Sequence, residues 1–129
     1  MHPLAILLAV TFLLAISFTN PAPGEDKPCH QHPQLSGKCF NVHGKLSVYN
    51  GAPAIRIWKI GTKRILGVSD QRFAIAGYRN IPPDLQQQIN QDVSITGDYL
   101  VCPFTASKPS EMQLVCIDKA RNLEVKKRE

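Results

Sequence analysis

Phe40 to Val68 reads FNVHGKLSVYNGAPAIRIWKIGTKRILGV, and this stretch decides the fold. Apolar and polar residues alternate from Phe40 to Tyr49 and again from Ala54 to Ile60, which is the period of a half-buried β-strand. Asn50-Gly51 lies between the two runs and favours a tight hairpin turn, because both residues tolerate positive φ. A third short run, RILGV, follows at 64–68. The stretch therefore predicts three consecutive antiparallel strands.

The pattern then changes. Ile81-Pro82-Pro83-Asp84 predicts a loop that begins a short helix, in which Leu85 and Ile89 are four residues apart and share one face. Alternation with a period of two returns from Val93 to Val101, and a fifth strand is expected from Met112 to Ile117. The predicted order is three strands, one short helix and two strands.

This element order, with Gly44 inside the first strand, resembles the OB-fold. The resemblance covers residues 40–122 and implies a mainly β fold, a small five-stranded OB-like Greek-key barrel with one short helix between strands 3 and 4. The block from Gly44 to Val68 is also similar to one shared by short, mostly uncharacterised secreted bacterial proteins. Another small barrel, or a meander with an appended helix, is the alternative architecture.

The N-terminus of this 129-residue chain is apolar: Met1 to Phe18 reads MHPLAILLAVTFLLAISF and carries no charged side chain. This run resembles the central region of a secretory signal peptide, although no Lys or Arg precedes it. It is shorter than the roughly 20 apolar residues of a membrane-spanning helix. We therefore expect a secreted or periplasmic protein, monomeric, with no transmembrane span in the mature chain. The expected parts are a signal peptide (1–19), a flexible leader with a Cys/His loop (20–38), the OB-like barrel (39–123) and a basic C-terminal tail (124–129).

The formal net charge of +5 includes three cations of the expected tail. Without Lys126, Lys127, Arg128 and the acidic Glu129, about +3 remains on the domain. This mildly basic balance favours anionic partners at low salt. It falls short of the basic stripe that is typical of nucleic-acid-binding proteins.

Four cysteines in an exported domain are expected to form two disulfides. If the last two strands turn near Pro109, Cys102 and Cys116 lie opposite each other and share one alternation class, as bridged cross-strand residues must. By elimination, Cys29 then pairs with Cys39. The predicted bridges are Cys102–Cys116 and Cys29–Cys39.

Histidines near the first cysteines suggest an alternative. Cys29, His30 and His32 form a C-H-x-H cluster, and Cys39 and His43 follow it. Imidazole and thiolate are ligands for zinc or copper. The spacing matches no standard zinc module, however, and an oxidising compartment competes for the thiols. We predict no metal and no cofactor, and we keep His30, His32 and His43 as the ligands of the alternative, a small metal-binding protein.

The outer face of strands 2 and 3 commonly binds oligonucleotides or oligosaccharides in OB-folds. On this face the resemblance places Arg56 and Trp58, with Lys45 and Tyr49 on the first strand and Lys63 near the following turn. A planar aromatic beside cations suits the stacking of a base or sugar ring next to an anionic group. The structural alternative is a packed Trp58 beside a solvated Arg56.

Catalytic motifs are missing from the sequence, which has no G-x-S-x-G elbow, no H-E-x-x-H and no glycine-rich phosphate loop. Its acidic residues are explained by turns, helix starts and strand edges. We therefore expect a protein that is not an enzyme. The expected function is an exported binding domain whose partner is an anionic polymer, an oligosaccharide or another protein.

Overall fold

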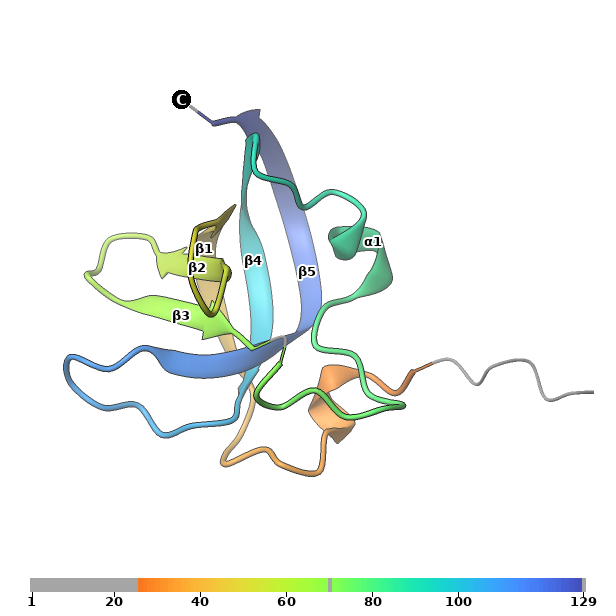
Figure 1. Cartoon of the computed structure of the whole chain (residues 1–129). Helices are drawn as coiled ribbons and strands as arrows, with labels where there is room; N and C mark the ends of the chain where they lie inside the picture. Colours follow the sequence, from red (N-terminus) through yellow and green to blue (C-terminus); the bar gives the residue numbers. More distant parts are fainter. Residues whose placement is uncertain (1–25, 70, 129) are drawn as a thin grey trace, which may run out of the picture.

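The computed structural model describes residues 26–69 and 71–128, and these form a mainly β domain (Figure 1). The strands are β1 (Phe40–Val48), β2 (Ile55–Lys59), β3 (Ile65–Val68), β4 (Val93–Pro103) and β5 (Gln113–Lys127). The helical segments are one 3-10 turn, η1 (Cys29–Gln31), and one short helix, α1 (Pro83–Gln86). The predicted signal peptide (1–19) lies outside the described residues. Within those residues, no helix has the length and hydropathy needed to cross a membrane.

The five strands form one mixed sheet that closes on itself in the order β1-β2-β3-β5-β4. All ladders are antiparallel except the short one between β3 and β5, which is parallel. The predicted meander is confirmed, because Trp58 of β2 lies opposite Lys45 of β1 on one side and Ile65 of β3 on the other. The mainly β class predicted from the alternation is therefore confirmed.

The apolar faces of the strands meet in one core inside the sheet. Val42, Leu46 and Ile57, which are apolar positions of the two alternating runs, are fully buried there. Tyr99 is also fully buried, and its hydroxyl donates a 2.6 Å hydrogen bond to the carbonyl oxygen of Ile95, so the buried O–H has a partner. Burial raises the pKa of Tyr99.

The expected short helix is a single turn. Pro83 is the first residue of this helix, where the missing N–H of proline costs no intrahelical hydrogen bond. Leu85 is buried in the core and Ile89 packs against it, so the two residues predicted to share a face both contact the barrel interior. In Figure 1 this turn lies beside β5 and covers the adjacent side of the sheet.

Gly44 lies in β1 directly against atoms of β2. A Cβ atom placed at Gly44 would overlap Cγ2 of Ile57 and lie 3.0 Å from the carbonyl oxygen of Trp58. The mid-strand glycine noted in the sequence therefore leaves room for the Ile57 side chain in the core, because no side chain fits at that point.

The C-terminal segment differs from the prediction of a basic tail over 124–129. Residues 124–127 belong to β5 and pair with Val93 to Thr96 of β4. Arg128 is held as well, since its backbone N–H donates to the carbonyl oxygen of Asp92 at 2.7 Å. The run of charges was misleading because a ladder is made by backbone groups, which pair whether or not the side chains are solvated.

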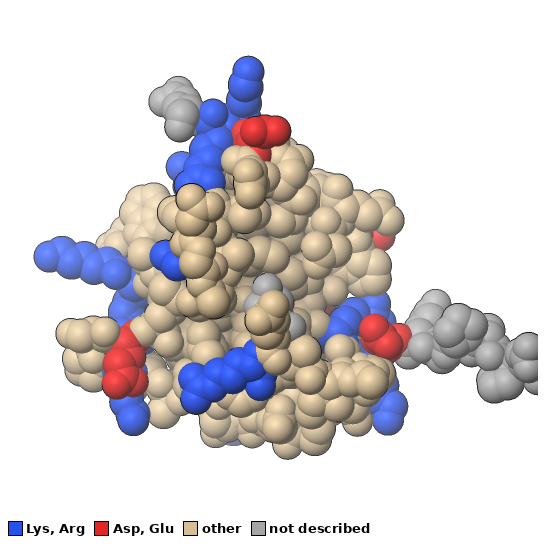
Figure 2. Space-filling model, viewed as in Figure 1, with Lys and Arg blue, Asp and Glu red and all other residues tan. Residues whose placement is uncertain are grey.

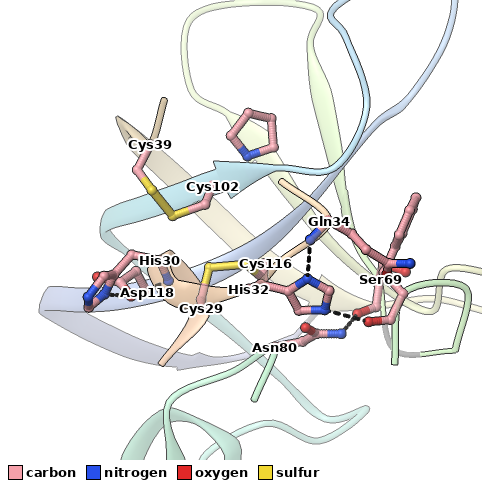
Figure 3. The surroundings of a disulfide bond; sticks show 12 residues. Cys29, His30, His32, Gln34, Cys39, Ser69, Asn80, Cys102, Cys116 and Asp118 are labelled. Atoms are coloured by element: carbon pink, nitrogen blue, oxygen red, sulfur yellow. Dashed lines mark hydrogen bonds and ion pairs between the residues drawn. A yellow bond between two sulfur atoms is a disulfide. The ribbon is translucent and has the colours of Figure 1, made fainter. Parts of the chain in front are cut away.

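The predicted disulfide pairing is wrong, although the register behind it is right. Cys102 does lie opposite Cys116 in the β4–β5 ladder. Each of them nevertheless bonds a cysteine of the N-terminal segment, giving Cys29–Cys116 and Cys39–Cys102 (Figure 3). The β1–β4 ladder explains the second bridge, because it pairs Phe40 with Val101 and so brings the preceding and following cysteines together. Assigning the second bridge by elimination was wrong, because the alternation within each strand does not reveal that β1 pairs with β4.

We expect Gly44→Ala to destabilise the domain by about 1–3 kcal/mol, the usual cost of forcing extra volume into a packed core. The measurement is urea unfolding followed by circular dichroism. Gly37→Ala is the matched control, because a Cβ there would meet only the Cγ of Pro103 at an ordinary 3.6 Å. Equal unfolding midpoints for the two variants would show that β1 and β2 separate easily at Gly44.

Candidate functional site

Four of the five predicted binding residues lie on neighbouring positions of the outer face of the sheet. Lys45 of β1 is directly opposite Trp58 of β2, and Arg56 is two residues before Trp58 on the same strand. Tyr49 comes directly after β1 and is 40% exposed. Lys45, Tyr49 and Trp58 line a common hollow, whereas Arg56 and Lys63 do not, and Lys63 lies in the turn between β2 and β3.

A hollow of about 590 Å³ covers this face, and we call it the cationic groove. Its lining includes two aromatic residues and four cations: Tyr49, Trp58, Lys45, Lys126, Lys127 and Arg128. No Asp or Glu of the described chain lines it. Figure 2 shows Lys and Arg side chains gathered at the end of the molecule where β5 finishes. The groove lining therefore combines cations with aromatic surface, and one of the cations, Lys126, lies with its Nζ 3.4 Å from Oε1 of Glu124.

The closed sheet explains how these residues meet. One row of mutually opposite residues crosses all five strands: Ile65, Trp58, Lys45, Thr96 and Glu124. Residues directly opposite in a ladder share a face and lie within contact of one another. The row brings the end of β5 onto the same surface as β1 and β2, although these segments are far apart in the sequence.

Two guanidinium groups hold one end of the groove around Tyr49. The Cζ atoms of Arg56 and Arg128 lie 5.1 and 4.8 Å from the centre of the Tyr49 ring, which is cation–π distance. Arg56 Nε also donates to the carbonyl oxygen of Pro53 at 3.0 Å, and Arg128 Nη1 donates to that of Val48. The positive charge at this end is therefore held in place before any ligand arrives.

Trp58 combines a structural contact with an open surface. Its indole Nε1 donates a 2.8 Å hydrogen bond to the carbonyl oxygen of Thr62, which fixes the ring against the β2–β3 turn. The residue is still 40% exposed, as is its cross-strand neighbour Ile65. The indole is thus oriented by the fold and keeps apolar surface toward solvent, which is what a stacking platform requires.

The structure does not bring His30, His32 and His43 together. His30 Nδ1 is 2.7 Å from an oxygen of Asp118, His43 Nδ1 is 2.9 Å from an oxygen of Asp98, and His32 is buried and bonded to a backbone carbonyl. The described residues contain one close group of three candidate metal-ligating atoms, and it consists of disulfide-bonded cysteines. The ligand set of the metal-binding alternative is therefore not assembled here.

Asp98 is the partner of His43 and also accepts a 2.9 Å hydrogen bond from Asn122 Nδ2. The hydrogen bond from Asn122, followed by that from His43, lowers the pKa of Asp98 below its usual value. The carboxylate stays ionised at neutral pH and lines a small hollow together with Arg121 and Lys119. It therefore balances local positive charge on the face of β4 and β5.

Asn122→Gly should raise the pKa of Asp98 toward the value of an unpaired carboxyl group, because the variant removes the strongest hydrogen bond to the ionised form. Glycine is chosen because Asn122 has a φ of 54°, which glycine adopts without strain. The measurement is an NMR titration of the Asp98 side chain. A depressed pKa adds stability above the pKa of the unfolded chain, near 3.9, and that stability disappears as the pH falls through the folded value. An unchanged titration midpoint would assign the shift to His43 instead.

A second hollow, of about 760 Å³, was not predicted from the sequence, and we call it the loop pocket. It lies between the β1–β2 turn and the β4–β5 loop, with apolar surface from Pro53, Met112 and Leu114. Its charged lining residues in the described chain are Arg72, Lys108 and Glu111. Irregular loops have no periodic pattern, so nothing in the sequence indicated that these two would face each other.

Hydrogen bonds hold the β4–β5 loop in position. Arg64 donates from Nη2 to Ser107 Oγ at 2.7 Å and from Nη1 to the carbonyl oxygen of Lys108 at 3.1 Å. At the base of the loop, Thr105 Oγ1 accepts the backbone N–H of Leu114 at 2.9 Å. One wall of the loop pocket is therefore preorganised.

The two hollows differ in chemistry. In the described chain, the charged residues that line the cationic groove are all cations, whereas the loop pocket combines apolar side chains with charges of both signs. The chain matches no protein-family model, no curated protein and no solved structure.

Proposed function

We propose that this protein is an exported, non-enzymatic domain of OB-like fold that binds an anionic polymer in the cationic groove. The observation that carries the proposal is the lining of that groove: Lys45, Lys126, Lys127 and Arg128 surround Tyr49 and Trp58. Four cations gathered in one concave surface raise the local concentration of anions.

The OB-like assignment is supported by the strand order. β4 follows β3 in the chain but pairs with β1, so the first four strands lie in the spatial order 4-1-2-3 of a Greek key. The long connection that allows this return contains α1, which lies between β3 and β4 in the chain as in the OB-fold.

A polymer suits the groove better than a small ion. The cations come from separated elements, with Lys45 on β1 and the other three at the end of β5. A chain with repeated negative charges can contact several of them at once, while one sugar or base ring stacks against Trp58. Contacts of this kind are screened by salt, so binding should weaken as ionic strength rises.

Export is supported by the two disulfides. Cys29–Cys116 and Cys39–Cys102 account for all four cysteines of the sequence. Structural disulfides form and persist in oxidising compartments. We therefore propose a secreted or periplasmic monomer that meets its anionic partner outside the cytoplasm.

The test is a pair of double variants with the same change of charge. Lys45→Gln with Lys126→Gln removes two cations of the groove, and Lys63→Gln with Lys119→Gln removes two exposed cations outside it. We expect at least tenfold weaker binding of a heparin oligosaccharide for the groove pair, with a shallower salt dependence, and little change for the control pair. The measurement is isothermal titration calorimetry at several salt concentrations.

Equal losses in the two double variants would show that net charge, and not the groove, attracts the polymer. A single-stranded oligonucleotide is the second probe in the same assay. Stronger binding of the oligonucleotide would assign the stacking surface of Trp58 to bases, and stronger binding of heparin would assign it to sugars.

The loop pocket favours a second candidate function, the binding of a small amphipathic anion. Pro53, Met112 and Leu114 offer an apolar surface for a hydrocarbon body, and Arg72 and Lys108 offer charge for its head group. The volume of about 760 Å³ is within the usual range of ligand sites. The hydrogen bonds of Arg64 to the loop lower the cost of ordering this wall on binding.

Octanoate is the probe for this second candidate. We expect it to shift the NMR signals of the Met112 methyl group and of Leu114, with affinity reduced severalfold in Lys108→Gln. Lys63→Gln is the control, because it removes the same charge outside the pocket. Shifts spread over the whole surface, with no difference between the variants, would contradict the assignment.

A further inference from the structure

The two disulfides lie next to each other at the base of the N-terminal segment (Figure 3). The sulfur atoms of Cys29, Cys102 and Cys116 all lie within 4.8 Å of one another. These three cysteines are completely buried, whereas Cys39 is only half-buried. An external thiol therefore reaches the Cys39–Cys102 bridge more easily than the Cys29–Cys116 bridge.

The strand register makes a third pairing available. Cys102 lies directly opposite Cys116 in the antiparallel β4–β5 ladder. Opposite residues in such a ladder have Cα atoms about 4.5–5.5 Å apart, which lies within the range of disulfide-bonded cysteines. A Cys102–Cys116 bond therefore needs side-chain rotation only, with no movement of either strand.

We propose that these cysteines form a thiol–disulfide exchange site, in which reduction of the Cys39–Cys102 bridge is passed to Cys29 and leaves a Cys102–Cys116 bond. The site needs an external dithiol as reductant. A single two-electron reduction by this dithiol releases both Cys29 and Cys39 from their disulfide bonds.

The exchange proceeds in three balanced steps. A thiolate of the external dithiol attacks the sulfur of Cys39, and Cys102 leaves as a thiolate. The second thiol of the dithiol displaces Cys39, which takes up a proton while the dithiol closes to a cyclic disulfide. The Cys102 thiolate then attacks the sulfur of Cys116, and Cys29 leaves as a thiolate and is protonated by water. The last step moves a bond without further oxidation or reduction.

The exchange frees the N-terminal segment from the barrel. In the starting state, both bridges join this segment to β4 and β5. Afterwards the segment is joined to the rest of the domain by the backbone at Phe40 and by non-covalent contacts, such as the 2.7 Å pair between His30 and Asp118 and the hydrogen bond from Lys27 N–H to the Gly77 carbonyl oxygen. The two strands keep a bridge between them, so the barrel stays stapled while the segment is released.

Two single variants test the exchange without any reductant. Cys39→Ser leaves Cys102 as a free thiol inside the sulfur cluster, and Cys102→Ser leaves Cys39 as a free thiol outside it. Each variant is incubated at mildly alkaline pH, quenched with acid, alkylated and mapped by mass spectrometry of its peptides. In Cys39→Ser we expect a Cys102–Cys116 bond and an alkylated Cys29 in the majority of molecules. In Cys102→Ser we expect Cys29–Cys116 to stay intact and only Cys39 to be alkylated.

The wild-type protein gives an independent test, should Cys39→Ser fail to fold. With one molar equivalent of dithiothreitol we expect alkylation at Cys29 and Cys39 together with a Cys102–Cys116 bond. Hydrogen exchange of residues 26–39 should then increase, while that of the β4–β5 ladder stays unchanged. Alkylation at Cys39 and Cys102 with Cys29–Cys116 intact would overturn the proposal, and so would a free Cys116.

Discussion

The pairing of β4 with β1 is the constraint on which the rest of the structure depends. It turns a three-strand meander into a closed sheet, because β4 returns to the free edge of β1 and β5 then fits between β4 and β3. The same ladder, continued by one residue pair, brings Cys39 to Cys102. It also places Thr96 beside Lys45, and through Thr96 the end of β5 joins the outer face of β1 and β2.

Both ends of the described chain are attached to this closed sheet, in different ways. The N-terminal segment is attached covalently, through bridges to β4 and β5. The C-terminal end is attached by backbone hydrogen bonds, which extend β5 to Lys127 and hold Arg128. A segment held by backbone pairing keeps its side chains available, so Lys126 and Lys127 can present charge in the groove. A segment held by disulfides can be released only by chemistry at sulfur.

Much of the fold could be predicted because alternation is a local property. Ile57 is buried and Trp58 is exposed, as their alternation requires. Half of the candidate groove could be predicted in the same way, since Lys45 and Trp58 belong to one hairpin whose turn sets the register. The half contributed by β5 could not, because Lys126 and Lys127 belong to a charged run whose pairing partner lies about thirty residues away.

The sequence by itself determined the strands of the meander, the place of Gly44 within the first of them and the facing of Cys102 and Cys116. Each of these follows from periodicity, turn chemistry or register within one hairpin, and these are interactions between neighbours in the chain. Only the tertiary structure decided the disulfide partners, the place of the C-terminal cations and the loop pocket. Those depend on which strand edges meet when the sheet closes. The backbone groups on a strand edge are the same whatever the side chains are, so the sequence of one strand does not identify the strand that pairs with it.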